Sequence, residues 1–116
     1  MPGTFSVNDH FVNKEASVRA LYDQLLKILN GFGPVTEMPK KTSIHIDRKS
    51  ALAGVETRRD CILLTIKADH KINSPRIEKH EQISARRFYH KVRVRSPKDF
   101  DAELKAWLKD AYRLAE

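Results

Sequence analysis

Hydrophobic residues recur at helical spacing along the segment KEASVRALYDQLLKILNGFGP. The stripe comprises Val18, Leu21, Tyr22, Leu25, Ile28 and Leu29. Gly31 predicts the end of this helix, and Pro34 prevents its continuation. A short helical turn is predicted before it, because Ser6 and Asp9 have the spacing of a capping box.

A second helical stripe lies in the C-terminal segment SPKDFDAELKAWLKDAYRLAE. It comprises Phe100, Leu104, Trp107, Leu108, Ala111 and Leu114. Ser96 is the predicted N-cap of this helix, with Pro97 at the first helical position and Asp99 at the third.

Between the two helices, hydrophobic and polar residues alternate, which is typical of strands with one buried face. The alternation covers TSIHI (42–46), LAGVET (52–57) and CILLTIK (61–67). The intervening RRD (58–60) predicts a tight turn. Gly54 indicates a bulge, a close backbone approach or a flexible strand end.

A further strand, RRFYHKVRVR (86–95), alternates with unusual regularity. Its apolar side would carry Phe88, His90, Val92 and Val94, and its other side Arg87, Tyr89, Lys91, Arg93 and Arg95. One face of this strand therefore requires a core, whereas the other requires water or an anion.

The order helix, three or four strands, helix predicts an α+β two-layer sandwich with both helices on one face of an antiparallel sheet. We expect residues 1–116 to form a single domain. Residues 68–85 show no clear period and contain a Ser-Pro break, so they predict a long loop, with a short helix over PRIEKHEQI as the alternative.

Composition is that of an ordinary globular protein, with 41% hydrophobic and 32% charged residues. No apolar run approaches the roughly 20 residues that span a bilayer, so we expect no membrane association. The opening residues MPGTFSVNDHF lack the pattern of a signal peptide, which indicates a cytoplasmic protein. The single cysteine, Cys61, agrees with a reducing compartment.

The net charge of +7 is unevenly distributed along the chain. Residues 40–95 contain fifteen lysines or arginines against six aspartates or glutamates, whereas the flanking segments contain seven against nine. Charge concentrated in one structural region creates a local positive potential, which is the usual property of a surface that binds an anionic partner.

The candidate anion-binding or nucleic-acid-binding residues are cations of the predicted strands, turns and loop, together with one tyrosine. They are Lys40, Lys41, Arg58, Lys67, Arg76, Arg87, Tyr89, Lys91, Arg93 and Arg95. Lysine and arginine neutralise phosphates, and a tyrosine between them can stack on a base or sugar. The alternative is a solvated strand face that protects the sheet from aggregation.

No residue pattern indicates catalysis, a cofactor or a metal. The five histidines lack the spacing of a metal site, and the glycines form no phosphate-binding loop. Cys61 and His45 would be a possible nucleophile and base only if they met on adjacent strands, and no oxyanion-binding group accompanies them. The sequence therefore favours a non-catalytic domain without a cofactor.

Several ordered blocks, HF…K…VRALYDQLL, GPVTEMPKKTSIHI, GVETRRDCILLTIKAD, SPRI, HKVRV and SPKDFDAELKAWLKDAY, resemble a bacterial family of small domains of unknown function. Members of this family stand alone or are appended to larger chains, some with nuclease-like regions. The resemblance covers nearly the whole chain and implies no catalytic residues, but it favours nucleic acid as a partner.

These observations predict a non-catalytic binding module for a polyanion, with nucleic acid as the expected partner, through the basic face of the sheet. The alternative is a small-ligand or protein-interaction domain in which loop 68–85 covers a pocket.

Overall fold

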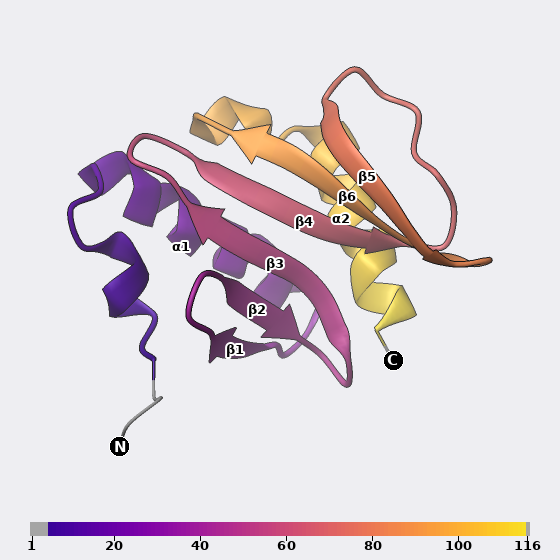
Figure 1. Cartoon of the computed structure of the whole chain (residues 1–116), viewed down its shortest axis with the longest axis horizontal. Coiled ribbons are helices and arrows are strands. Elements are labelled where there is room, and N and C mark those ends of the chain that lie inside the picture. Colours follow the sequence, from indigo (N-terminus) through magenta and orange to yellow (C-terminus); the bar gives the residue numbers. More distant parts are fainter. Residues whose placement is uncertain (1–4, 116) are drawn as a thin grey trace.

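A computed structural model of the chain describes residues 5–115, which form an open antiparallel sheet with two α-helices (Figure 1). Residues 1–4 and residue 116 lie outside the described residues. The first four belong to the segment MPGTFSVNDHF, which was expected to be no signal peptide. The elements are η1 (Asn8–Phe11), α1 (Ala16–Phe32), β1 (Thr36–Pro39), β2 (Ile44–Asp47), β3 (Ala51–Thr57), β4 (Ile62–Ala68), β5 (Ile77–Ser84), β6 (Arg87–Val94), η2 (Pro97–Asp99) and α2 (Ala102–Leu114).

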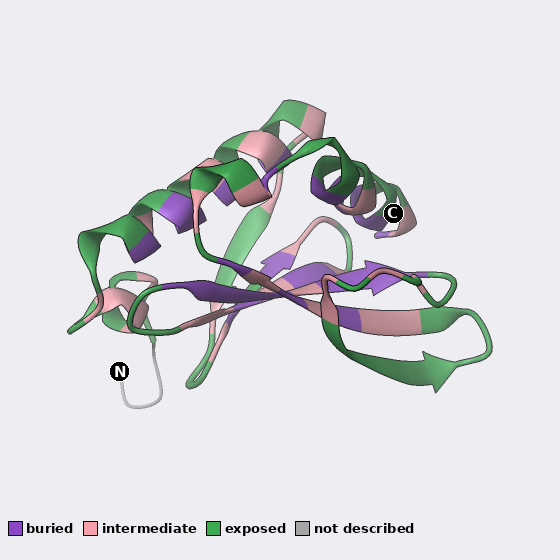
Figure 2. Ribbon diagram, turned by 90° about the horizontal axis from the view of Figure 1, so that it is seen from above, coloured by how far each residue is buried: buried purple, intermediate pink, exposed green. Residues whose placement is uncertain are grey.

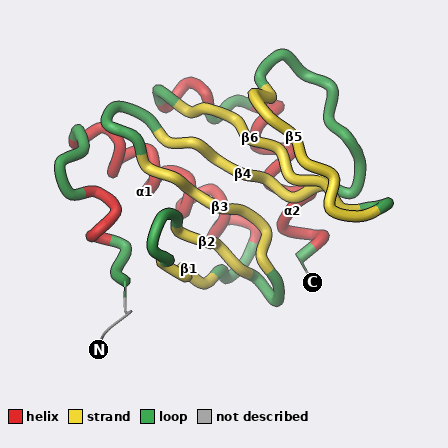
Figure 3. Tube along the Cα trace, in the orientation of Figure 1, coloured by secondary structure: helices red, strands yellow, loops and turns green. Residues whose placement is uncertain are grey.

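The six strands are ordered β1-β2-β3-β4-β6-β5, and every neighbouring pair is antiparallel. Strands β1 and β5 form the two edges (Figure 3). Both α-helices lie on the same side of the sheet (Figure 2). The α+β class, the antiparallel pairing and the helices on one face are therefore confirmed.

The expected number of three or four strands is wrong, because both edge strands were missed. Strand β1 has four residues and only Pro39 is partly buried. Strand β5 is exposed along nearly its whole length on both faces. Neither has one buried face, so neither shows the alternation by which strands are found in a sequence. The loop or short helix expected at 68–85 is likewise corrected, since only 69–76 connects β4 to β5.

The core lies between the helices and the inner strands. It includes Val18, Leu21, Tyr22, Leu25, Leu29, Ile44, Ile46, Leu52, Val55, Ile62, Leu64, Ile66, Val92, Val94, Phe100, Leu104, Leu108 and Ala111. Residues 62, 64 and 66 alternate toward the helices, as the period of two predicts. Both predicted helical stripes face this core, with Ile28, Trp107 and Leu114 only half-buried at its margin.

Each helix has a boundary that differs from the expected one. Helix α1 continues through Gly31 to Phe32, and Gly33 follows with a φ of 157°. Ser96 and Asp99 do form a capping box, but it caps η2, and α2 begins only after a second N-cap. The Asp101 carboxylate is that N-cap and accepts a hydrogen bond from the Leu104 amide at 3.0 Å. The short helical turn predicted at Ser6 and Asp9 is confirmed as η1.

Gly33 is needed because the two helices meet there. The Tyr112 hydroxyl of α2 lies against the Gly33 backbone and donates a hydrogen bond to the Pro34 carbonyl at 3.2 Å. A Cβ atom at residue 33 would collide with this hydroxyl. Both the positive φ and the close approach therefore require glycine.

Within the described residues, none of the helices has the length and apolar composition needed to cross a bilayer.

We predict that Gly33→Ala lowers the free energy of unfolding by about 1–3 kcal/mol, because the substitution adds backbone strain and displaces Tyr112. The matched control is Gly31→Ala, since a Cβ there meets no atom within 4 Å. That control should raise the free energy of unfolding by roughly 0.5–1 kcal/mol, because alanine is the better helix former. Urea unfolding measures both values, and equal effects of the two substitutions would contradict the assigned role of Gly33.

Candidate nucleic-acid interface

The face of the sheet opposite the helices carries the cationic side of β6. His90, Val92 and Val94 are buried on the helix side, and Arg87, Tyr89, Lys91 and Arg93 alternate with them on the other side. The predicted division of this strand into an apolar and a cationic face is therefore confirmed. We call the sheet surface that bears residues 87, 89, 91 and 93 the open face.

Strand register places residues of all six strands in one row across the open face. The row runs Met38, His45, Gly54, Thr65, Lys91 and Lys79 from β1 to β5. Its two lysines are direct neighbours on β6 and β5. Positive charge therefore gathers toward the β5 edge, and the smallest residue lies near the centre.

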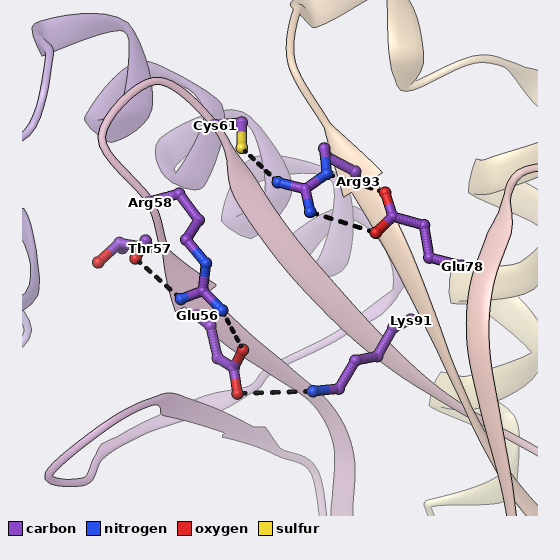
Figure 4. Close-up of polar contacts among 7 residues, drawn as sticks. All are labelled: Glu56, Thr57, Arg58, Cys61, Glu78, Lys91 and Arg93. Atoms are coloured by element: carbon purple, nitrogen blue, oxygen red, sulfur yellow. Dashed lines mark hydrogen bonds and ion pairs between the residues drawn. The ribbon is translucent and has the colours of Figure 1, made fainter.

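Carboxylates hold three cations of the open face, Arg58, Lys91 and Arg93, in place (Figure 4). The Glu56 carboxylate lies 3.1 Å from an Arg58 guanidinium nitrogen and 3.7 Å from the Lys91 ammonium. Arg93 donates two hydrogen bonds to Glu78, at 2.8 and 3.2 Å, and a third to the Cys61 sulfur at 3.3 Å. The hydrogen bonds with Arg93 lower the pKa of Glu78, so this carboxylate remains charged well below neutral pH.

Cations outnumber carboxylates on this face. The cations are Arg58, Lys67, Lys79, Arg87, Lys91 and Arg93, and the carboxylates are Asp47, Glu56, Glu78 and Glu81. Among the described residues, Lys79 and Arg87 take part in no ion pair. They are the cations most available to a phosphate.

Lys67 differs from the other cations because it is nearly buried. Its side chain lies between β3 and β6, only 6% of the residue is exposed, and its ammonium donates to the Ser50 hydroxyl at 3.3 Å. Burial, and then the neighbouring charge of Arg87, lowers the pKa of Lys67. It contributes charge beneath the surface, whereas Arg87 can contact a ligand directly.

Three other predicted cations lie at the end of the sheet. Lys40 and Lys41 are exposed in the connection from β1 to β2, which register places at the same end as the turn that contains Arg58. Arg95 is exposed directly after β6 at that end. These residues extend the basic surface beyond the strands.

Arg76 does not join the open face. Its guanidinium donates to the Asp101 and Glu103 carboxylates, at 2.8 and 3.3 Å, and to the Asp99 carbonyl at 2.7 Å. It also lies 5.7 Å from the centre of the Trp107 ring. This arginine therefore fastens the end of loop 69–76 to the start of α2.

A hollow of about 300 Å³ opens in the middle of the open face. It is lined by Ser43, His45, Ala51, Ala53, Gly54, Glu56, Thr65 and Tyr89. A smaller hollow of about 140 Å³ lies toward β5 and shares Thr65 and Tyr89 with the first. Tyr89 therefore lies between two depressions. Alternation along β6 predicts that Tyr89 lies on this face, but the convergence of the lining residues around Gly54 depends on strand order and register.

A larger hollow of about 990 Å³ lies on the helix side, between the C-terminal ends of α1 and α2 and the start of loop 69–76. Acidic and basic residues both line it, and Asp69 pairs with His70 and Asp110 with Arg113. The loop thus borders this groove rather than the hollow beside Tyr89.

Residues 7–115 match a family described as Domain of unknown function (DUF5655). The chain belongs to this family. Neither the curated proteins nor the solved structures gave a match. Membership in DUF5655 assigns no activity, so the function has to be argued from the open face and its hollow.

Cysteine and histidine do not form a chemical centre in the described part of this DUF5655 domain. Residues 5–115 contain no group of three or more histidine, cysteine, aspartate or glutamate side chains able to hold a metal ion. Cys61 is buried against Arg93, and β3 separates its neighbourhood from His45 on β2. Cys61 and His45 therefore do not meet on adjacent strands, as a nucleophile and its base would have to.

His90 has a structural contact instead. It is fully buried, and its Nε2 atom accepts a hydrogen bond from the Ile72 amide at 3.0 Å, which fixes loop 69–76 to β6. This bond requires an unprotonated Nε2. Burial, followed by the nearby His80 and His70, lowers the pKa of His90.

We predict that acid weakens the fold through His90. The unfolded chain binds a proton below its pKa of about 6.5, whereas buried His90 resists protonation, so the free energy of unfolding is fully retained above that pH and falls below it. The slope from this group reaches at most about 1.4 kcal/mol per pH unit. Urea unfolding between pH 7.5 and 5.5 measures the slope. His90→Gln, which keeps an acceptor but does not titrate, should show a smaller slope, and an unchanged slope would refute the assignment.

Proposed function

We propose that this domain binds single-stranded nucleic acid through the open face of its sheet. The observation that carries the proposal is one sheet surface, uncovered by any described helix, on which Tyr89 lies beside Lys91, Lys79 and Arg87. Sheets that bind single strands combine cations for the phosphates with an aromatic ring for an unstacked base.

The ion pairs on the open face are compatible with phosphate binding. Lys91 and Glu56 are both about one-third exposed, and Glu78 is more exposed than its partner Arg93. Exposed ion pairs contribute only about 0–1 kcal/mol, so exchange of a carboxylate for a phosphate costs little. Before nucleic acid binds, the carboxylates hold these long side chains against the sheet. Less side-chain conformational entropy is therefore lost on binding.

The form of the surface favours single strands over a duplex. A base can reach Tyr89 only if it is unstacked, and the hollows on either side of the ring are small and close to the sheet. A duplex presents its phosphates but keeps its bases inside the helix. Single-stranded DNA or RNA can use both the cations and the ring.

The alternative of a small ligand or protein held by residues 68–85 has less support. Residues 77–84 are engaged as β5, and loop 69–76 is fastened by Ile72 to His90 and by Arg76 to Asp101. A segment tied down at two points has little freedom to close over a ligand.

We predict that fluorescence anisotropy with a labelled ten-nucleotide single strand will detect salt-dependent binding. Engagement of three to five phosphates would give a slope of log affinity against log salt of about −2 to −3.5. The double variant Lys79→Glu and Arg87→Glu should weaken binding at least tenfold at low salt, because it reverses the two exposed cations of the open face that take part in no ion pair.

The matched control is the double variant Lys105→Glu and Lys109→Glu. It makes the same change in net charge on exposed positions of α2, on the far side of the sheet. It should bind almost as wild type. Equal weakening by the two double variants would indicate attraction by net charge alone, and no binding by the wild type at low salt would refute the proposal. Urea unfolding establishes that all variants remain folded.

A further inference from the structure

We infer that the hollow between Gly54 and Tyr89 is a subsite for one nucleobase of the bound strand. This inference rests on the proposed function and adds to it a specific place for a base. Three residues that line the hollow support this position: Gly54, which the fold does not require to be glycine, the aromatic Tyr89, and the ion-paired carboxylate of Glu56.

Gly54 has no structural reason to be glycine. It lies in regular register between His45 and Thr65, and the irregularity in this part of the sheet falls between Ile46 and Asp47. Among the described glycines, only Gly33 has a positive φ. Glycine in a strand interior costs roughly 0.5–1 kcal/mol relative to alanine, so its presence needs another explanation.

Lack of room for a side chain does not explain the glycine at position 54. A Cβ atom on Gly54 would lie 3.8 Å from the Thr65 Cβ atom and 4.0 Å from a ring carbon of His45, which are ordinary contacts. Alanine at this position is therefore compatible with the sheet. What glycine provides is a gap in the side chains of the open face, and such a gap in a strand is typical of a place where a ligand approaches the backbone.

Tyr89 provides the stacking surface. It is half-buried, and it lines the hollow above Gly54 as well as the smaller one toward β5, so the ring lies at the boundary of both. The volume of about 300 Å³ is at the lower end of the range for small-molecule sites. A hollow of this size suits a single base.

Polar groups around the hollow suit the edge of a base. Glu56 lines it, and each of its carboxylate oxygens has one cationic partner, Arg58 or Lys91. A carboxylate has about four acceptor positions, so two remain for the amino group of a base such as cytosine. Lys91 also borders the smaller hollow, where it can reach the phosphate next to the stacked base.

The test compares ten-nucleotide oligo-deoxycytidine with an abasic strand that has the same number of phosphates. For the wild type, the strand with bases should bind about 5- to 150-fold more tightly, which is the range for stacking of one base. Gly54→Val fills the hollow with a residue that favours strands, and it should bind both strands with the affinity that the wild type shows for the abasic one.

Tyr89 offers an independent variant. Tyr89→Ala should lose the preference for the strand with bases, and Tyr89→Phe, which keeps the ring, should retain it. Urea unfolding of each variant excludes loss of the fold as the cause.

The outcomes separate the subsite from the proposed function. A preference for bases that survives in Gly54→Val overturns the subsite. A wild type that binds both strands equally also overturns it, while the open face remains a surface for phosphates. If neither strand binds at low salt, the subsite and the proposed function both fail.

Discussion

The burial of one sheet face beneath two amphipathic helices is the constraint on which the rest of this structure depends. The helices contact the inner strands β3 and β4, and Tyr112 joins the end of α1 to α2. Two helices side by side cannot cover six strands, so β1 and most of β5 extend past the core. The arrangement leaves the other face of the sheet, which carries the candidate site, uncovered by the described helices.

On the open face, charged side chains, rather than a second layer of helices or strands, shield the sheet residues beneath them from water. Leu63 and Lys67 are only 7% and 6% exposed, although both described α-helices lie on the other side of the sheet. Leu63 lies between Glu56 and Arg93 in the register, and the aliphatic parts of such side chains can shield an apolar neighbour while their charged ends reach water. The ion pairs thus arrange cations on the open face, and Gly54 leaves a gap among its side chains.

The local elements could largely be predicted from the sequence. Periodicity gave both helices and the inner strands, and the faces of β6 followed from alternation. Strand β5 could not be found this way because both of its faces meet water, and β1 is too short to show a period. Helix α1 continues past Gly31 and ends before Gly33, because Gly33 is the residue that Tyr112 approaches closely. Tyr112 lies 79 positions later in the sequence, so this contact could not be read from the local pattern.

For the candidate site, the sequence by itself determined which residues are cationic and which side of β6 carries them, since charge and alternation are local properties. Only the tertiary structure decided which of them act together. Arg76 was grouped with the other cations by charge, yet it is bound to Asp101 and Glu103 on the helix side. Gly54, Thr65 and Tyr89 converge because β6 pairs with β4 and β4 with β3, and strand order and register are set by packing over the whole core.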